Sequence, residues 1–183
     1  MHGGSPTCFP LPRCVDAVAS VASPFTNAAN ASGSTTDNVR KRLIKAPKLY
    51  LNDTGLLAYL LGIDQENLAT PGGHVGALLE AFVHQELREQ VTWSRTQPAL
   101  YYYRTGANRE VDFVLQRRSG HVVGIEVKAA VKLRAEDMKG LTDLAATTGK
   151  RFRAGVVLYQ GSTIVPFGDR LWAVPLAAMF AGR

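Results

Sequence analysis

Hydrophobic and polar residues alternate in two neighbouring stretches of the second half of the chain, with Val114 at one position where a polar residue would be expected. Residues 110–115 read Glu-Val-Asp-Phe-Val-Leu, and residues 124–128 read Gly-Ile-Glu-Val-Lys. Such alternation predicts two strands, and the polar, glycine-containing run between them is typical of a hairpin turn. Because side chains two positions apart share a face of a strand, Glu126 and Lys128 should point the same way. In the expected hairpin register, Asp112 joins them on that face.

Apolar residues elsewhere predict further helices and strands. Helical spacing predicts a short helix over residues 56–61, a longer one over 75–91 and a third over 135–147. Strands are expected at residues 99–104, 152–159, 163–165 and 171–174, with a last helical turn at 176–180. This order predicts a mixed α/β core.

Composition divides the chain into three parts. Residues 1–38 are rich in small and polar residues, and we expect them to be a disordered or unrelated leader. A secretory signal is disfavoured, because Asp16 interrupts the only apolar candidate. Residues 39–71 contain Pro47, which favours an extended path, and we interpret them as a linker region. Residues 72–183 form the expected α/β domain.

Net charge and cysteine content indicate which binding partners and which cellular compartment to expect. The chain has 183 residues, is 46% hydrophobic and carries a formal net charge of +6, which suits a polyanionic partner. It contains no apolar run of about twenty residues, so no membrane partner is expected. Cys8 and Cys14 have no partners at zinc-site spacing. This usage fits a reducing cytoplasm.

The predicted long helix supplies a third carboxylate. Glu80 lies on the flank of its apolar stripe, and Glu86 falls nearer the middle. A carboxylate that faces a core needs a partner, because an unpaired buried charge is costly. Either residue alone is more simply a surface glutamate tied to a base such as Arg88. Together with Asp112 and Glu126, however, Glu80 indicates a site.

These residues resemble a known superfamily. Glu80, Asp112 and the triplet Glu126-Val-Lys128 are similar to the motif of PD-(D/E)XK nuclease-like proteins. Several blocks also resemble bacterial and archaeal proteins that join an AAA-type ATPase to a C-terminal domain of unknown function. The matching blocks are residues 41–50, 53–57, 76–83, 86–87, 102–104, 110–114, 125–128 and 174–176. The resemblance implies a restriction-endonuclease-like fold, a mixed sheet flanked by helices.

The chain also departs from that family. It lacks the phosphate-binding loop G-x-x-x-x-G-K-[ST], so ATP is not expected to bind. Residues 1–38 do not resemble the helices of the winged-helix segment that usually precedes the Lys-Ala-Pro-Lys-Leu-Tyr block at 45–50. Residues 39–71 are therefore expected to be a remnant of that region. The chain looks like the truncated C-terminal part of an ATPase-associated protein.

The resemblance implies phosphodiester hydrolysis at a catalytic set of Glu80, Asp112, Glu126 and Lys128. The three carboxylates are hard oxygen ligands that suit Mg²⁺ or Mn²⁺. The cation would activate water for attack on nucleic acid. Lys128 would orient that water or stabilise the charge of the transition state.

Less specific interpretations remain open. Glu126 and Lys128 can be an ordinary ion pair on a solvated sheet face. The domain can also be an inactive module that binds nucleic acid or protein, or a docking module that has lost its ATPase. The basic residues proposed for phosphate contact are Arg40, Lys41, Arg42, Lys45, Lys48 and Arg104. His74, His84 and His121 are expected at the surface or as caps, and a homo-oligomer is left open.

Overall fold

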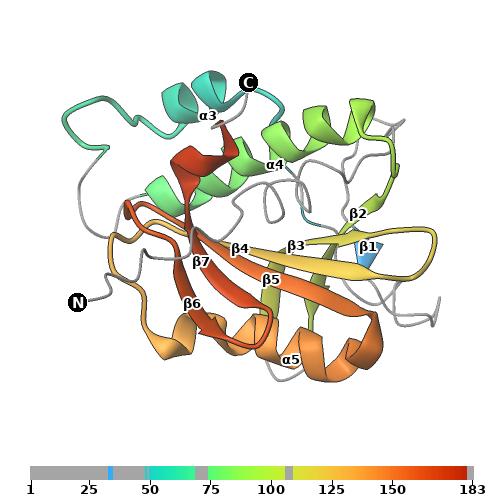
Figure 1. Ribbon diagram of the computed structural model, residues 1–183. Helices are drawn as coiled ribbons and strands as arrows, with labels where there is room; N and C mark the ends of the chain where they lie inside the picture. Colours follow the sequence, from blue (N-terminus) through green and yellow to red (C-terminus); the bar gives the residue numbers. More distant parts are fainter. Residues whose placement is uncertain (1–32, 35–47, 49, 69–73, 106–108, 181–183) are drawn as a thin grey trace, which may run out of the picture.

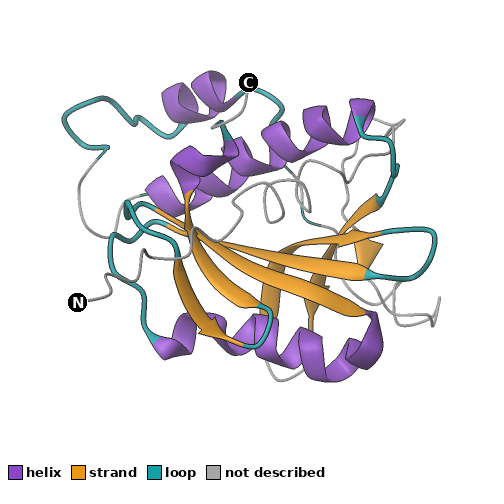
Figure 2. Cartoon of the chain, in the orientation of Figure 1, coloured by secondary structure: helices purple, strands orange, loops and turns teal. Residues whose placement is uncertain are grey.

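A mixed β-sheet covered by helices on both faces forms the centre of the molecule (Figures 1 and 2). A computed structural model describes residues 33–34, 48, 50–68, 74–105 and 109–180. The strands are β1 (Gly33–Ser34), β2 (Ala99–Arg104), β3 (Glu110–Gln116), β4 (Val122–Lys128), β5 (Phe152–Tyr159), β6 (Val165–Gly168) and β7 (Leu171–Pro175). The helices are α3 (Thr54–Leu60), α4 (Val75–Trp93), η1 (Ala135–Met138), α5 (Lys139–Thr148), η2 (Gly149–Arg151) and η3 (Leu176–Met179). The predicted α/β class is confirmed.

The strand order in the sheet is β1-β2-β3-β4-β5-β7-β6. Strands β2, β3 and β4 form an antiparallel meander, which includes the predicted hairpin. Strand β5 is parallel to β4, and the connection between them carries η1 and α5. Strand β7 is parallel to β5, and β6 is antiparallel to β7 at the edge. The meander therefore lies next to a parallel crossover unit, and β4 belongs to both.

Two hydrophobic cores hold the three layers together. One lies between α4 and the sheet and includes Leu87, Phe113 and Ile125. The other lies between α5 and the opposite face and includes Leu141 and Val157. Figure 1 shows α3 and α4 on one side of the sheet and α5 on the other. Because both faces are covered, five successive residues of β4 are buried, from 122 to 126.

Two glycines allow α5 to lie close to the sheet. A Cβ at Gly124 of β4 would come within 2.7 Å of Leu141 and 2.8 Å of Leu144. A Cβ at Gly140, near the start of α5, would overlap the backbone carbonyl of Glu110 in β3. Real side chains do not tolerate such contacts, so these positions need glycine if the layers are to pack this closely. The start of α5 is thereby held against the beginning of β3.

Most predicted elements are confirmed, and the differences have local causes. The third helix begins as the 3₁₀ helix η1 and continues as α5. At its N-terminus, the backbone N–H of Arg134 donates to the side chain of Asp137, which caps the helix. The strand predicted at 163–165 starts only at Val165. The Tyr159 hydroxyl donates to the Thr163 carbonyl at 2.6 Å, and this contact holds the chain between these two residues in a turn. No described helix is both long and apolar enough to cross a membrane.

The described part of the first 71 residues contacts the α/β unit. Gly33 and Ser34 pair in parallel with Tyr101 and Tyr102 of β2. The rest of residues 1–38 lies outside the described residues, so the disordered or unrelated leader stays a prediction. Further along, Tyr50 packs against the α4-side core and α3 lies against α4.

Candidate functional site

Strands β3 and β4 part at Asp112. Their ladder ends at the pair Phe113–Ile125, and the β2–β3 ladder shifts register between Tyr101 and Tyr103, which marks a bulge at the same place. Beyond the last pair, the backbone N–H of Val127 donates to Oδ2 of Asp112 at 2.9 Å. A bulge re-aims side chains. Here it places a carboxylate that is 7% exposed in the opening between two strands.

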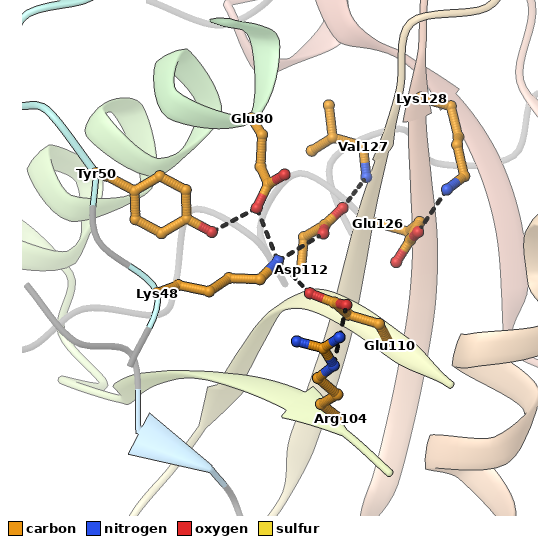
Figure 3. A network of polar contacts seen from close by, with 9 residues as sticks. All are labelled: Lys48, Tyr50, Glu80, Arg104, Glu110, Asp112, Glu126, Val127 and Lys128. Carbon is orange, nitrogen blue, oxygen red and sulfur yellow. Dashed lines mark hydrogen bonds and ion pairs between the residues drawn. The ribbon is translucent and has the colours of Figure 1, made fainter. Parts of the chain in front are cut away.

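The ammonium of Lys48 lies at the centre of three carboxylates (Figure 3). Its Nζ is 2.6 Å from Oε1 of Glu110, 2.8 Å from Oε1 of Glu80 and 3.0 Å from Oδ1 of Asp112. A lysine has three N–H donors, so these acceptors satisfy it fully. The carboxylates come from α4 and β3, whereas Lys48 precedes both elements in the chain. We call these four residues the Lys48 cluster.

Tyr50 and His84 support Glu80 from the α4 side. The Tyr50 hydroxyl donates to Oε1 of Glu80 at 2.5 Å, and its ring stacks on His84 with 4.1 Å between centroids. His84 is 2% exposed, so the expectation of a surface residue was wrong. Burial, with a smaller contribution from Arg88, lowers the pKa of His84 to about 4. A neutral imidazole therefore packs inside the core at ordinary pH.

Glu126 and Lys128 form a separate pair on the opposite face of the sheet opening. Lys128 Nζ donates to Oε1 of Glu126 at 2.7 Å, so the predicted shared face is confirmed. Gly124, two positions earlier, faces α5, and Glu126 follows it on that side. Glu126 is only 8% exposed, and its Oε2 is buried without a hydrogen-bond partner among the described residues. The pair is therefore not on a solvated face.

Burial and neighbouring charges together raise the pKa values of Lys48, Asp112 and Glu126. Burial disfavours the charged form of Lys48, but Asp112 and Glu80 outweigh it and raise the pKa of the ammonium. Burial, reinforced by Glu80, raises the pKa of Asp112. Burial and the neighbouring Asp112 carboxylate raise the pKa of Glu126 to about 7. Two acids that share one site and resist ionisation are typical of functional sites.

One cleft of about 420 Å³ joins the Lys48 cluster and the Glu126–Lys128 pair. The start of α5 forms its other wall. Carboxylates outnumber basic side chains in the lining by six to four, so the cleft is acidic although the whole chain is basic. The lining residues are Lys48, Glu80, Arg109, Glu110, Asp112, Glu126, Lys128, Glu136, Asp137, Lys139 and Gly140.

The structure brings the four predicted catalytic residues to this cleft, namely Glu80, Asp112, Glu126 and Lys128. Glu86 does not line it. The basic residues predicted to contact phosphates are placed differently. Arg40, Lys41, Arg42 and Lys45 lie outside the described residues, Lys48 is held by acids, and Arg104 lies 3.7 Å from Glu110.

Three residues of the site were missed or misassigned by sequence reasoning. Glu110 and Tyr50 were not predicted, and Lys48 was assigned to phosphate contact. A signal existed for Glu110, because it stands two positions before Asp112 on the same strand. Lys48 and Tyr50 are likewise two positions apart. Nothing in that spacing showed which partner they would meet.

The donor atoms suit a hard cation, but their present arrangement does not form a ligand set. Among the described residues, no three His, Cys, Asp or Glu side chains are grouped so that they could hold a metal ion. The Lys48 ammonium already lies among three of the relevant carboxylates. Oε2 of Glu126 is buried without a hydrogen-bond partner among the described residues, so this oxygen is available as a metal ligand. Binding of Mg²⁺ or Mn²⁺ stays a prediction.

Two mycobacterial proteins are similar to this chain. They are the uncharacterized protein Rv2008c of Mycobacterium tuberculosis and the uncharacterized protein Mb2031c of Mycobacterium bovis. Each is 31% identical over 140 residues, which cover 75% of this chain and 29% of the relative. The chain thus spans less than a third of their length. No solved structure matches it.

Two family descriptions match the chain. Residues 28–67 match a domain of unknown function, DUF8612. Residues 75–179 match another, DUF4143, and this match contains α4, the hairpin, α5 and the strands up to β7. Because the second match covers more than half of the chain, the protein belongs to the DUF4143 family.

Proposed function

We propose that this protein is an ATPase-associated, PD-(D/E)XK nuclease-like domain that hydrolyses phosphodiester bonds of nucleic acid in the acidic cleft, with a divalent cation. The observation that supports it is the convergence of Glu80, Asp112, Glu126 and Lys128 from α4, β3 and β4 on one cleft. These are the residue types that such hydrolysis needs: oxygen ligands for a cation and an amine beside them. The ATPase association rests on the sequence blocks that the chain shares with such proteins.

The proposed cation ligands are Asp112 and Glu126, with Glu80 beside them. Glu126 Oε2 is buried without a partner among the described residues, and a buried anionic oxygen without a partner favours a bound cation. When bound, Mg²⁺ or Mn²⁺ would act as a Lewis acid on the phosphodiester. Burial, reinforced by a neighbouring carboxylate, raises the pKa values of Asp112 and Glu126, and a bound cation would favour the ionised form of both acids.

Charge explains why the reaction would depend on added cation. A phosphodiester is an anion, and the cleft carries more carboxylates than basic groups. Nucleic acid should therefore be repelled from the reacting position until a cation is present. The overall net charge of +6 still favours loose association of a polyanion with the rest of the molecule.

Lys128 is the residue proposed to act on the phosphate. Its side chain is about one-third exposed at the cleft and is held at Nζ by Glu126. The ammonium can turn towards an incoming phosphate without leaving the cleft, because its stem is flexible. There it would stabilise the negative charge that develops during hydrolysis.

The test is nicking of supercoiled plasmid and cleavage of single-stranded RNA by the full chain. Mg²⁺, Mn²⁺ and chelator are compared for wild type, Asp112→Asn, Lys128→Met and the control Lys150→Met, at an exposed lysine outside the cleft lining. We expect cation-dependent cleavage that falls about 100-fold or more in the first two variants and is retained in the third. Cleavage that persists in Asp112→Asn, or its complete absence from wild type with either metal, would overturn the proposal.

A second candidate function is a binding module without chemistry. The observation in its favour is Lys48, which already neutralises Asp112 and Glu80 at 3.0 and 2.8 Å. A site balanced by its own lysine needs no metal to be stable. Gel retardation of nucleic acid that is insensitive to chelator, together with no cleavage, would favour this alternative.

A further inference from the structure

The Lys48 cluster uses the same oxygens as the proposed cation site. Lys48 contacts Oδ1 of Asp112 and Oε1 of Glu80, and both residues belong to the proposed ligand set. The other oxygen of Asp112 accepts from Val127 N–H. While Lys48 stays, both oxygens of Asp112 are therefore engaged, Oε1 of Glu80 is held by Lys48 and Tyr50, and the buried Oε2 of Glu126 has no hydrogen-bond partner among the described residues. A cation that is bound through one or two carboxylates, with water completing its shell, would therefore lack Asp112 as a ligand while Lys48 stays.

Lys48 is also placed so that it can leave. Its side chain is 20% exposed and opens onto the cleft. Within the described part of the chain, the Lys48 ammonium contacts three carboxylates, and a divalent cation would attract these carboxylates more strongly because of its higher charge. Tyr50 holds Glu80 independently, so that carboxylate would keep its position after the ammonium departs.

We propose that Lys48 and a divalent cation bind the same carboxylates in alternation, so that the metal enters the cleft when Lys48 leaves it. This inference rests on the proposed function and adds its regulation: the segment before α3 carries the residue that closes the site. Whatever moves that segment would control metal loading. Lys48 is a positioning and blocking residue in this scheme, and no reacting atom contacts it.

Binding of Mn²⁺ to the full chain, measured by electron paramagnetic resonance of the free ion, is the primary test. Lys48→Met keeps the length of the side chain and removes its charge, and Lys150→Met is the matched control at an exposed lysine that does not line the cleft. We expect Lys48→Met to lower the Kd for Mn²⁺ at least tenfold relative to wild type and Lys150→Met to leave it unchanged. Asp112→Asn should abolish binding in both backgrounds.

A second measurement needs no variant at Lys48 and covers the case in which Lys48→Met does not fold. Wild-type protein is acetylated with a trace of acetic anhydride, with and without Mn²⁺, and modification is read by mass spectrometry. Acetylation of Lys48 should rise several-fold with Mn²⁺, because the ammonium is released, while that of the exposed Lys150, outside the cleft lining, stays constant.

The outcomes separate the inference from the proposed function. Equal Kd values for wild type and Lys48→Met, or Lys48 acetylation that Mn²⁺ does not change while Asp112-dependent binding occurs, overturn the alternation and leave the nuclease proposal standing. No Mn²⁺ binding to any variant, or binding that survives Asp112→Asn, overturns both.

Discussion

Nζ of Lys48 lies 3.0 Å from Oδ1 of Asp112, although 64 positions of sequence separate the two residues. This contact joins the segment before α3 to the opening between β3 and β4. It places a positive charge where the proposed activity needs a metal ion. The stability of the fold and the accessibility of its site therefore depend on the same ammonium.

Replacing Lys48 with methionine should destabilise the protein. Three carboxylates would lose their shared ammonium, and removing one partner of a largely buried charge group costs about 2–4 kcal/mol. Urea unfolding at pH 8 measures the difference. Lys139→Met, whose ammonium is 3.5 Å from the exposed Glu136, should change the free energy of unfolding by less than about 0.5 kcal/mol. Equal effects of the two variants would contradict the central role of Lys48.

Glu126→Gln should stabilise the protein at alkaline pH. The folded pKa of Glu126 is about 7, above its ordinary value of 4.5, mainly because of burial. Its contribution to stability is therefore complete below about pH 4.5 and is lost as the pH rises through 7. Glutamine cannot ionise. The free energy of unfolding of the variant, relative to that of wild type, should therefore increase by on the order of 1–3 kcal/mol as the pH rises from about 5 to about 8. Thermal unfolding across this range measures the gain, and Glu136→Gln, which is exposed, should show none.

His84 should make the protein sensitive to acid. Its folded pKa of about 4 lies below the ordinary 6.5. The contribution of the neutral imidazole to the stability of the fold is therefore complete above pH 6.5 and is lost as the pH falls towards 4. Relative to His84→Leu, wild type should lose about 2–3 kcal/mol over that interval. The exposed His74 provides the control, and His74→Leu should follow wild type. Parallel pH profiles for wild type and His84→Leu would show that the imidazole is solvated.

Gly140→Ala should disturb both packing and site, whereas Gly76→Ala should not. Both glycines are the second residue of a helix. A Cβ at position 140 would overlap the Glu110 carbonyl, so the start of α5 must move from β3, at a cost of about 1–3 kcal/mol. A Cβ at position 76 has open space, so alanine there should raise the free energy of unfolding by up to about 1 kcal/mol. Opposite signs in urea unfolding are the expected result.

The helices, the strands and one half of the site could be predicted from local patterns. Two-residue alternation correctly put Glu126 and Lys128 on one face of β4, because this period is a property of every strand. Apolar spacing located α4 and with it Glu80. The same patterns misplaced His84, because burial of a polar residue depends on what stacks on it, here Tyr50.

The arrangement of Asp112 was beyond the reach of such patterns. A regular hairpin would have turned Asp112 towards Glu126 and Lys128, but the bulge and the end of the β3–β4 ladder turn it towards Lys48 and Val127 N–H. A bulge depends on how three strands are matched in register, and alternation within one strand carries no information about it.

The sequence alone therefore determined the α/β class, the hairpin and three of the acids that line the cleft, since periodicity and residue type act over a few neighbouring positions. Only the tertiary structure decided which amine those acids meet. Glu80 and Asp112 lie 32 and 64 positions from Lys48, and contacts over such separations exist only once α4, the bulged β3 and the segment before α3 have packed together. The packing of these distant elements therefore places the Lys48 ammonium at the centre of the site, among the acids.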